Sequence, residues 1–158
     1  EEWFFRGWLW TRLDGGRRTL GGAWLTSIIF GFAHAFRPGA LEERVTHDFA
    51  GAMEALFGWL RHAASPESFG PAFMGLFLLA MVLSGALHRT RNLWTAVGVH
   101  AGGVLVLFGQ GVFTDEVEGA PAWIATKHLY DAPAGWALLG VSALVLWLLP
   151  QRETATTS

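Results

Sequence analysis

Long apolar stretches separated by short polar segments dominate the chain. A helix that crosses the hydrocarbon core of a bilayer needs about 20 mostly apolar residues. Residues 20–36, 71–87, 93–113 and 134–149 approach that length with few or no charged side chains, and residues 3–13 resemble the end of a further helix. The pattern predicts an all-α, multi-pass transmembrane helix bundle. A large apolar helical domain in water is the alternative.

The segment between the first two full-length stretches has a periodicity of its own. Apolar residues recur there every three or four positions, at Val45, Phe49, Met53, Leu56 and Leu60. This spacing puts them on one face of a helix. We therefore expect an extra amphipathic helix that lies in the membrane interface or packs on a neighbouring helix.

The two ends of the chain predict its domain organisation. The chain opens on Glu1-Glu2-Trp3 without a methionine, and an apolar run follows at once. We therefore expect an N-terminally truncated membrane core over residues 1–150, with earlier helices missing, and a polar tail over residues 151–158.

Charged residues separate the two ends of the predicted helices. One end carries mostly arginines, namely Arg12, Arg17, Arg18, Arg89, Arg91 and Arg152, with Asp14 and Glu153 as its acids. The loops at the other end, residues 37–70 and 114–133, hold most of the remaining acids. Basic residues favour the cytoplasmic side of membrane proteins. The arginine-rich end and the C-terminal tail are therefore predicted to be cytoplasmic.

Composition narrows the class of protein. Only 15% of the residues are charged and 52% are hydrophobic, whereas soluble domains carry roughly 25% charged residues. The absence of cysteine excludes a disulfide scaffold, and a net charge of −2 argues against a nucleic-acid partner. Arginine far outnumbers lysine, which indicates a GC-rich bacterial genome. We expect a protein of the bacterial inner membrane whose partners are the lipid bilayer and a membrane-bound peptide or protein.

Ionisable groups within the apolar helices are costly to bury and often serve function. Glu2 and Arg6 are i,i+4 neighbours in the favourable order for an ion pair, and Glu1 points about 100° away on an α-helix. Counting helical rise from the predicted cytoplasmic ends places Glu1, His34 and His100 at similar depth, so these groups could meet. The alternatives are acids that flank a helix start, histidines in a packed core, and a proton relay of a transporter.

Three spacings in separate helices carry a family resemblance. They are Glu1-Glu2-x-x-x-Arg6, Phe30-x-x-x-His34 and His100-x-x-x-Val104. In this order they resemble the motifs EExxxR, FxxxH and HxxxN of the CPBP (CAAX protease and bacteriocin-processing) family of intramembrane proteases. Residues 89–100 also resemble the family's approach to the third motif, and the resemblance extends over residues 1–107.

The resemblance implies an all-helical membrane core that hydrolyses a peptide bond with activated water. Carried over to this chain, Glu1 is the general base and His34 its partner, whereas Glu2 pairs with Arg6 and supports the site. His100 is expected to hold the oxyanion. These roles suit amide hydrolysis, which needs a base for water, an acid for the leaving amine and a stabiliser for the oxyanion.

Two alternatives concern Val104 and a metal ion. Val104 stands where the family has asparagine, and its side chain donates no hydrogen bond. Loss of one oxyanion donor costs roughly 10²–10³ in rate, so the alternative function is a catalytically impaired membrane binding or immunity protein. Glu1, His34 and His100 could together bind zinc. The resemblance favours a glutamate-based reaction that requires no cofactor.

Overall fold

The computed structural model describes residues 1–35, 49–51, 53, 54, 57, 58, 66–113, 121, 123 and 132–148. Regular structure in these residues is entirely helical, which confirms the all-α prediction. The helices are η1 (Trp3–Leu9), α1 (Trp10–Leu13), α2 (Leu20–Ala35), α4 (Pro66–Thr90), α5 (Leu93–Phe113) and α6 (Pro133–Leu148). The four long ones agree closely with the predicted apolar stretches. The predicted amphipathic helix and the polar tail lie mostly outside the described residues.

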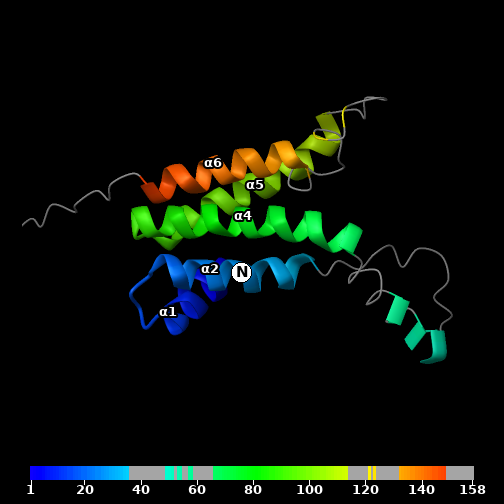
Figure 1. Ribbon diagram of the computed structural model, residues 1–158, viewed down its shortest axis with the longest axis horizontal. Helices are drawn as coiled ribbons and strands as arrows, with labels where there is room; N and C mark the ends of the chain where they lie inside the picture. The colour runs from blue at the N-terminus through cyan, green and yellow to red at the C-terminus, as the bar shows by residue number, and fades with distance from the viewer. Residues whose placement is uncertain are drawn as a thin grey trace, which may run out of the picture.

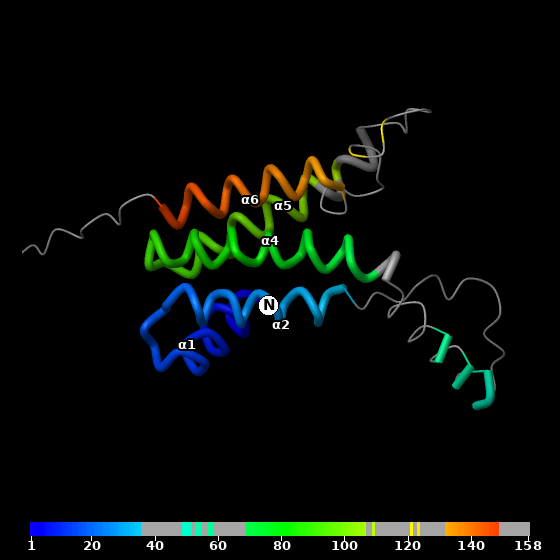
Figure 2. Tube along the Cα trace, in the orientation of Figure 1, coloured from blue at the N-terminus to red at the C-terminus, as the bar shows by residue number. Residues whose placement is uncertain are grey.

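Helix α4 is the centre of the bundle. It runs between α2 and α6 and also packs on α5 (Figures 1 and 2). Its side chains Ala80, Leu83 and Leu87 are completely buried. Over Phe69–Thr90, α4 is long and apolar enough to cross a membrane, and it is the one helix of the described ranges that passes this test.

Two of the other apolar helices are shorter than the thickness of a bilayer core. Helices α2 and α6 have 16 residues each, or about 24 Å at 1.5 Å per residue, against roughly 30 Å of hydrocarbon. Helix α5 has 21 residues, or about 31 Å at 1.5 Å per residue. The helix positions therefore agree with the predicted bundle, and multiple membrane crossings remain a prediction.

A tight turn returns the chain from α1 to α2. Gly15 and Gly16 have φ angles of 63° and 83°, a region that glycine adopts at little cost. The backbone N–H of Thr19 then donates to Asp14 Oδ2 at 2.6 Å, and Thr19 Oγ1 accepts the N–H of Gly22 at 3.2 Å. Thr19 thus caps the N-terminus of α2, which lets α2 pack on the helix that carries the first motif.

Gly22 is needed where Trp10 packs on α2. A Cβ atom at Gly22 would lie 2.6 Å from Asp14 Oδ2 and 2.8 Å from Trp10 Cδ1, and Trp10 is completely buried. We expect Gly22→Ala to lower the free energy of unfolding by about 1–3 kcal/mol through overpacking, measured in detergent. Gly21→Ala is the matched control, since the nearest atom there is 3.9 Å away. Equal stability of the two variants would contradict this packing account.

Candidate active site

The first motif forms a buried ion pair. Arg6 Nη1 donates to Glu2 Oε1 at 3.0 Å, and both side chains are almost completely shielded. Arg6 Nη2 donates to the carbonyl oxygen of Ala80 on α4 at 3.2 Å, and the guanidinium lies 4.5 Å from the ring centre of Phe30 on α2. The predicted pair is therefore present, and it also links η1 to two other helices.

The helix that carries this motif has a π-helical backbone. The N–H of Trp10 donates to the carbonyl of Phe5, five residues earlier, at the C-terminal end of η1. The N–H of Phe5 donates to the carbonyl of Glu1 at 2.9 Å, so helical hydrogen bonding reaches the first residue. The apolar run of this segment predicts the end of an ordinary helix instead. Short π-helical segments are rare and often occur at functional sites.

The second motif fixes the orientation of a histidine. His34 Nδ1 lies 2.9 Å from the carbonyl oxygen of Phe30, and the Phe30 ring stacks on the imidazole at 4.0 Å between centroids. Because a carbonyl only accepts hydrogen bonds, Nδ1 must carry a proton. The other nitrogen, Nε2, faces Glu1 Oε2 at 3.3 Å. The four-residue spacing of the motif thus sets both the position and the tautomer of His34.

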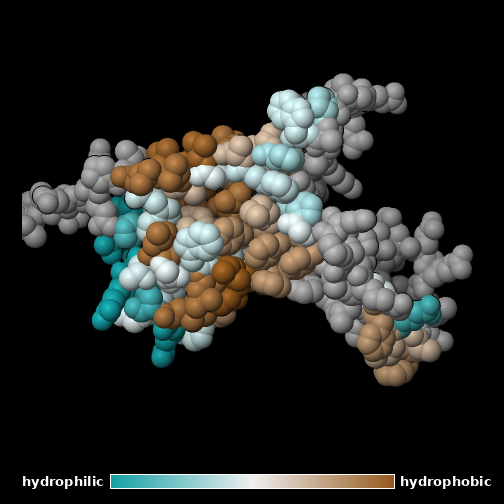
Figure 3. All heavy atoms as spheres, in the orientation of Figure 1, coloured by the Kyte–Doolittle hydropathy of each residue, from teal (hydrophilic) through white to brown (hydrophobic). Residues whose placement is uncertain are grey.

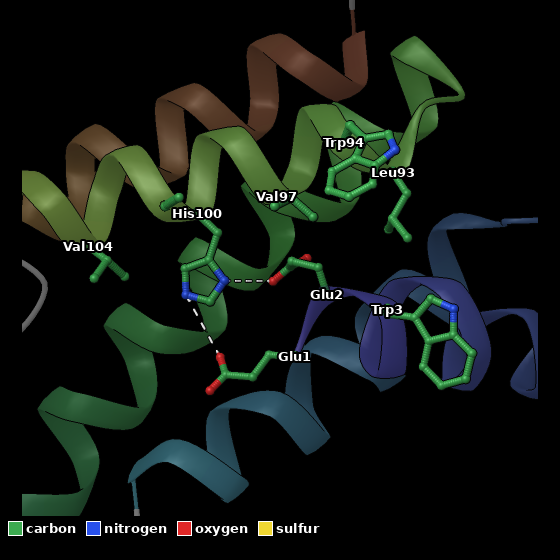
Figure 4. A pocket seen from close by; sticks show the side chains of 9 residues that line it. Glu1, Glu2, Trp3, Leu93, Trp94, Val97, His100 and Val104 are labelled. Atoms are coloured by element: carbon green, nitrogen blue, oxygen red, sulfur yellow. Dashed lines mark hydrogen bonds and ion pairs between the residues drawn. The ribbon is translucent and has the colours of Figure 1, made fainter.

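His100 contacts both glutamates of the first motif (Figure 4). Its Nδ1 lies 2.8 Å from Glu2 Oε1, and its Nε2 lies 3.9 Å from Glu1 Oε2. The same oxygen of Glu2 also accepts from Arg6. The contact between Glu2 and His100 joins residues 98 positions apart and was not predicted from the sequence.

The structure brings Glu1, His34 and His100 together from three separate elements, as their similar depth predicted. The two glutamates lie in different surroundings. The side chain of Glu1 is 56% exposed, whereas that of Glu2 is 4% exposed. Glu1 can therefore reach a substrate or water, while Glu2 is enclosed between a guanidinium and an imidazole.

A pocket of about 510 Å³ opens between η1 and α5 beside these groups (Figure 4). This volume is within the usual range for ligand sites. Its lining comprises Glu1, Glu2, Trp3, Leu93, Trp94, Val97, His100, Ala101 and Val104. The α5 members recur at helical spacing, so the periodicity of this segment could have indicated one lining face. Among the apolar lining residues, only Val104 was predicted to lie at the site from the sequence.

Val104 lies one helical turn beyond His100 and lines the same pocket. Its side chain is apolar and partly exposed. The position that carries asparagine in the third motif therefore faces the site without a hydrogen-bond donor.

A metal ion is the alternative occupant of the same residues. Oxygen from glutamate and nitrogen from histidine are suitable zinc ligands. However, the described residues contain no group of three or more His, Cys, Asp or Glu arranged to hold a metal ion. Glu1, His34 and His100 therefore do not form a zinc site in the geometry observed.

Comparison with known families agrees with the three motifs. The family model described as type II CAAX prenyl endopeptidase Rce1-like matches residues 1–106, a range that contains every motif residue. The chain belongs to the Rce1-like family. No curated protein and no solved structure matches it. The resemblance to CAAX proteases is thus confirmed, and the Rce1-like family is a family of membrane-embedded proteases.

Proposed function

We propose that this protein is an intramembrane endopeptidase that hydrolyses a peptide bond of a membrane-associated protein or peptide. The observation that carries the proposal is the contact between Glu1 and His34. Oε2 of Glu1 lies 3.3 Å from Nε2 of His34, and Glu1 lines a pocket large enough for part of a peptide. Membership of a protease family supports the same reaction class.

The hydrogen bonds of His34 support a role in proton transfer. With Nδ1 protonated toward Phe30, a neutral His34 presents a lone pair at Nε2 to Glu1. A proton must therefore lie between these two groups for the contact to be favourable. In the proposed reaction, Glu1 takes a proton from water as the hydroxide adds to the substrate carbonyl carbon. That proton passes to the departing amine as the C–N bond breaks, and His34 holds Glu1 and shares its proton.

His100 is the proposed donor to the oxyanion of the tetrahedral intermediate. Its Nδ1 faces Glu2, so Nε2 can donate to the oxyanion when both ring nitrogens carry protons. A charged donor makes a hydrogen bond roughly twice as strong as a neutral one, which offsets part of the loss at Val104. Glu2 and Arg6 are positioning residues in this proposal, because they act through His100.

A membrane location is supported by the surface of the helices. Large apolar side chains are exposed on several helices, among them Trp24, Phe32, Leu105, Leu138 and Leu144, and apolar surface is prominent in Figure 3. Exposed apolar patches of this kind mark a surface that contacts lipid or protein. We propose that α2, α4, α5 and α6 span the bacterial inner membrane with the C-terminus in the cytoplasm.

Val104 favours a second candidate, a catalytically impaired member that binds a membrane peptide or acts as an immunity protein. In the protease proposal, Val104→Asn restores a second oxyanion donor and raises kcat by up to about 10²-fold. The assay uses the full-length protein in liposomes with a panel of membrane-anchored peptides, including a prenylated CAAX peptide, and detects fragments by mass spectrometry. Val104→Leu is the control and leaves kcat near the wild-type value. Absence of cleavage by both wild type and Val104→Asn would refute the protease proposal and favour the binder.

The proposed reaction needs no metal cofactor, because Glu1 and His34 supply its proton transfers. We expect the cleavage rate in the same assay to be unchanged after prolonged treatment with EDTA. A rate that falls with EDTA and returns on addition of zinc would contradict the metal-free reaction. It would leave the assignment of the protein as a protease intact.

A further inference from the structure

Cationic side chains gather at the end of the bundle where α4 turns into α5. His88 and Arg89 lie in the last turn of α4, Arg91 follows in the connecting turn, and Arg18 comes from the turn between α1 and α2. The charges of all three arginines act on the imidazole of His88, which also hydrogen-bonds the backbone of Arg18. Hydrophilic side chains are concentrated at this end of the molecule (Figure 3). Two turns distant in sequence therefore form one basic site.

The imidazole at the centre of the site is fixed by α6. Trp147 stacks on His88 with ring centroids 4.7 Å apart and an interplanar angle of 25°. The indole Nε1 donates to the carbonyl of Met81 at 3.4 Å. A Cβ atom at Gly85 would lie 3.1 Å from this nitrogen, so the indole ring packs closely on that glycine. The arginines thus lie near an aromatic pair that joins α4 to α6.

The backbone at two of the arginines is also unusual. Arg18 and Arg91 have φ angles of 52° and 55°, a left-handed conformation that is uncommon for residues other than glycine. Strain of this kind persists where the surrounding structure imposes it, and it clusters at ligand sites and switch regions. The geometry of both turns is consistent with a built binding site.

The described turns at this end carry more basic than acidic side chains. Asp14 is the one acidic residue in these turns; its Oδ2 accepts from Thr19, and its Oδ1 is buried without a hydrogen-bond partner. Nη1 of Arg89 is buried and has no hydrogen-bond partner. A buried guanidinium nitrogen without an acceptor is costly, so an anion that approached Arg89 would be stabilised there.

We propose that Arg18, Arg89 and Arg91 bind the phosphate group of an anionic phospholipid. Guanidinium groups match phosphate oxygens in charge and in their two-pronged hydrogen-bond geometry. The site lies at the end of the one described helix that is long enough to span a bilayer, where lipid headgroups would be located. Inorganic phosphate shares this chemistry and is the competing source. The proposal depends on the membrane location and is independent of the proteolytic activity.

The test is native mass spectrometry of the full-length protein in detergent with equal amounts of phosphatidylglycerol and phosphatidylcholine. We expect the wild type to retain phosphatidylglycerol preferentially. Arg89→Gln and Arg91→Gln should each lower retention about fivefold, the effect of roughly one membrane-surface arginine. Arg12→Gln is the matched control, because Arg12 is exposed at the same end and lies over the ring of Trp8 instead. It should retain lipid as the wild type does.

Three results would overturn the proposal. They are equal retention of both lipids, an equal loss in Arg12→Gln and Arg91→Gln, and displacement of phosphatidylglycerol by millimolar inorganic phosphate, which would assign the site to soluble phosphate. Arg91→Gln keeps the test valid if Arg89→Gln does not fold, because Arg91 is exposed whereas Arg89 is partly buried. Peptide cleavage is measured on the same samples, so that failure of lipid binding and failure of the protease proposal are distinguished.

Discussion

Glu1→Gln is expected to lower kcat for peptide cleavage by about 10²–10⁴, the usual contribution of a general base. Glutamine has nearly the same shape as glutamate and can still hydrogen-bond His34, but it cannot take a proton from water. The measurement is the rate of fragment release from a membrane-anchored peptide in liposomes. The large expected effect follows from the half-exposed position of Glu1 beside the pocket and from its 3.3 Å contact with His34.

Glu54→Gln provides the matched control for this loss. Glu54 is an exposed carboxylate that does not line the pocket, so the same chemical change there should leave kcat unaltered. His34→Ala should reproduce most of the effect of Glu1→Gln, because both variants break one proton-transfer pair. Wild-type rates in both Glu1→Gln and His34→Ala would show that these residues do not activate water.

The largest expected effect on stability comes from Arg6→Met. Removing the guanidinium leaves Glu2 buried without its cation, and breaking a buried ion pair typically costs about 3–5 kcal/mol. The substitution also removes the hydrogen bond to the carbonyl of Ala80 and the contact with the Phe30 ring. The measurement is the free energy of unfolding in mixed detergent micelles.

Two further variants separate charge burial from the loss of one side chain. Arg12→Met removes an exposed arginine six residues after Arg6, and it should change stability by well under 1 kcal/mol, as surface substitutions usually do. The double variant Glu2→Gln with Arg6→Met should be more stable than Arg6→Met alone, because no charge is then left unpaired. A cost of Arg6→Met no larger than that of Arg12→Met would contradict the structural role of the ion pair.

Much of the architecture could be predicted from short-range patterns. Uninterrupted apolar stretches located α2, α4, α5 and α6, because a helix with lipid or protein on all sides carries few charges. The pairing of Glu2 with Arg6 followed from their spacing along one helix. The meeting of Glu1 with His34 and His100 followed from estimates of depth, since parallel and antiparallel helices bring residues of equal depth to one level.

Contacts between distant segments could not be predicted in the same way. Glu2 meets His100, and Arg6 meets the backbone of Ala80, only because η1 packs against α4 and α5. The apolar pattern of the sequence also gives no indication that the backbone of η1 is π-helical. Trp94 and Val97 line the pocket, and their helical spacing from His100 was visible, but an apolar face on a membrane helix has many uses. Only the packing of η1 against α5 shows that this apolar face lines the pocket.

Hydrolysis in ¹⁸O-labelled water tests the central claim most directly, because that claim concerns the origin of the attacking oxygen and the residues that activate it. The full-length wild type and His34→Ala are incubated in liposomes with the same membrane-anchored peptide, and the new carboxyl terminus is analysed by mass spectrometry. We predict that the wild-type product carries one ¹⁸O atom and that His34→Ala yields little product over the same time. Equal amounts of labelled product from the two proteins would contradict activation of water by the Glu1–His34 pair.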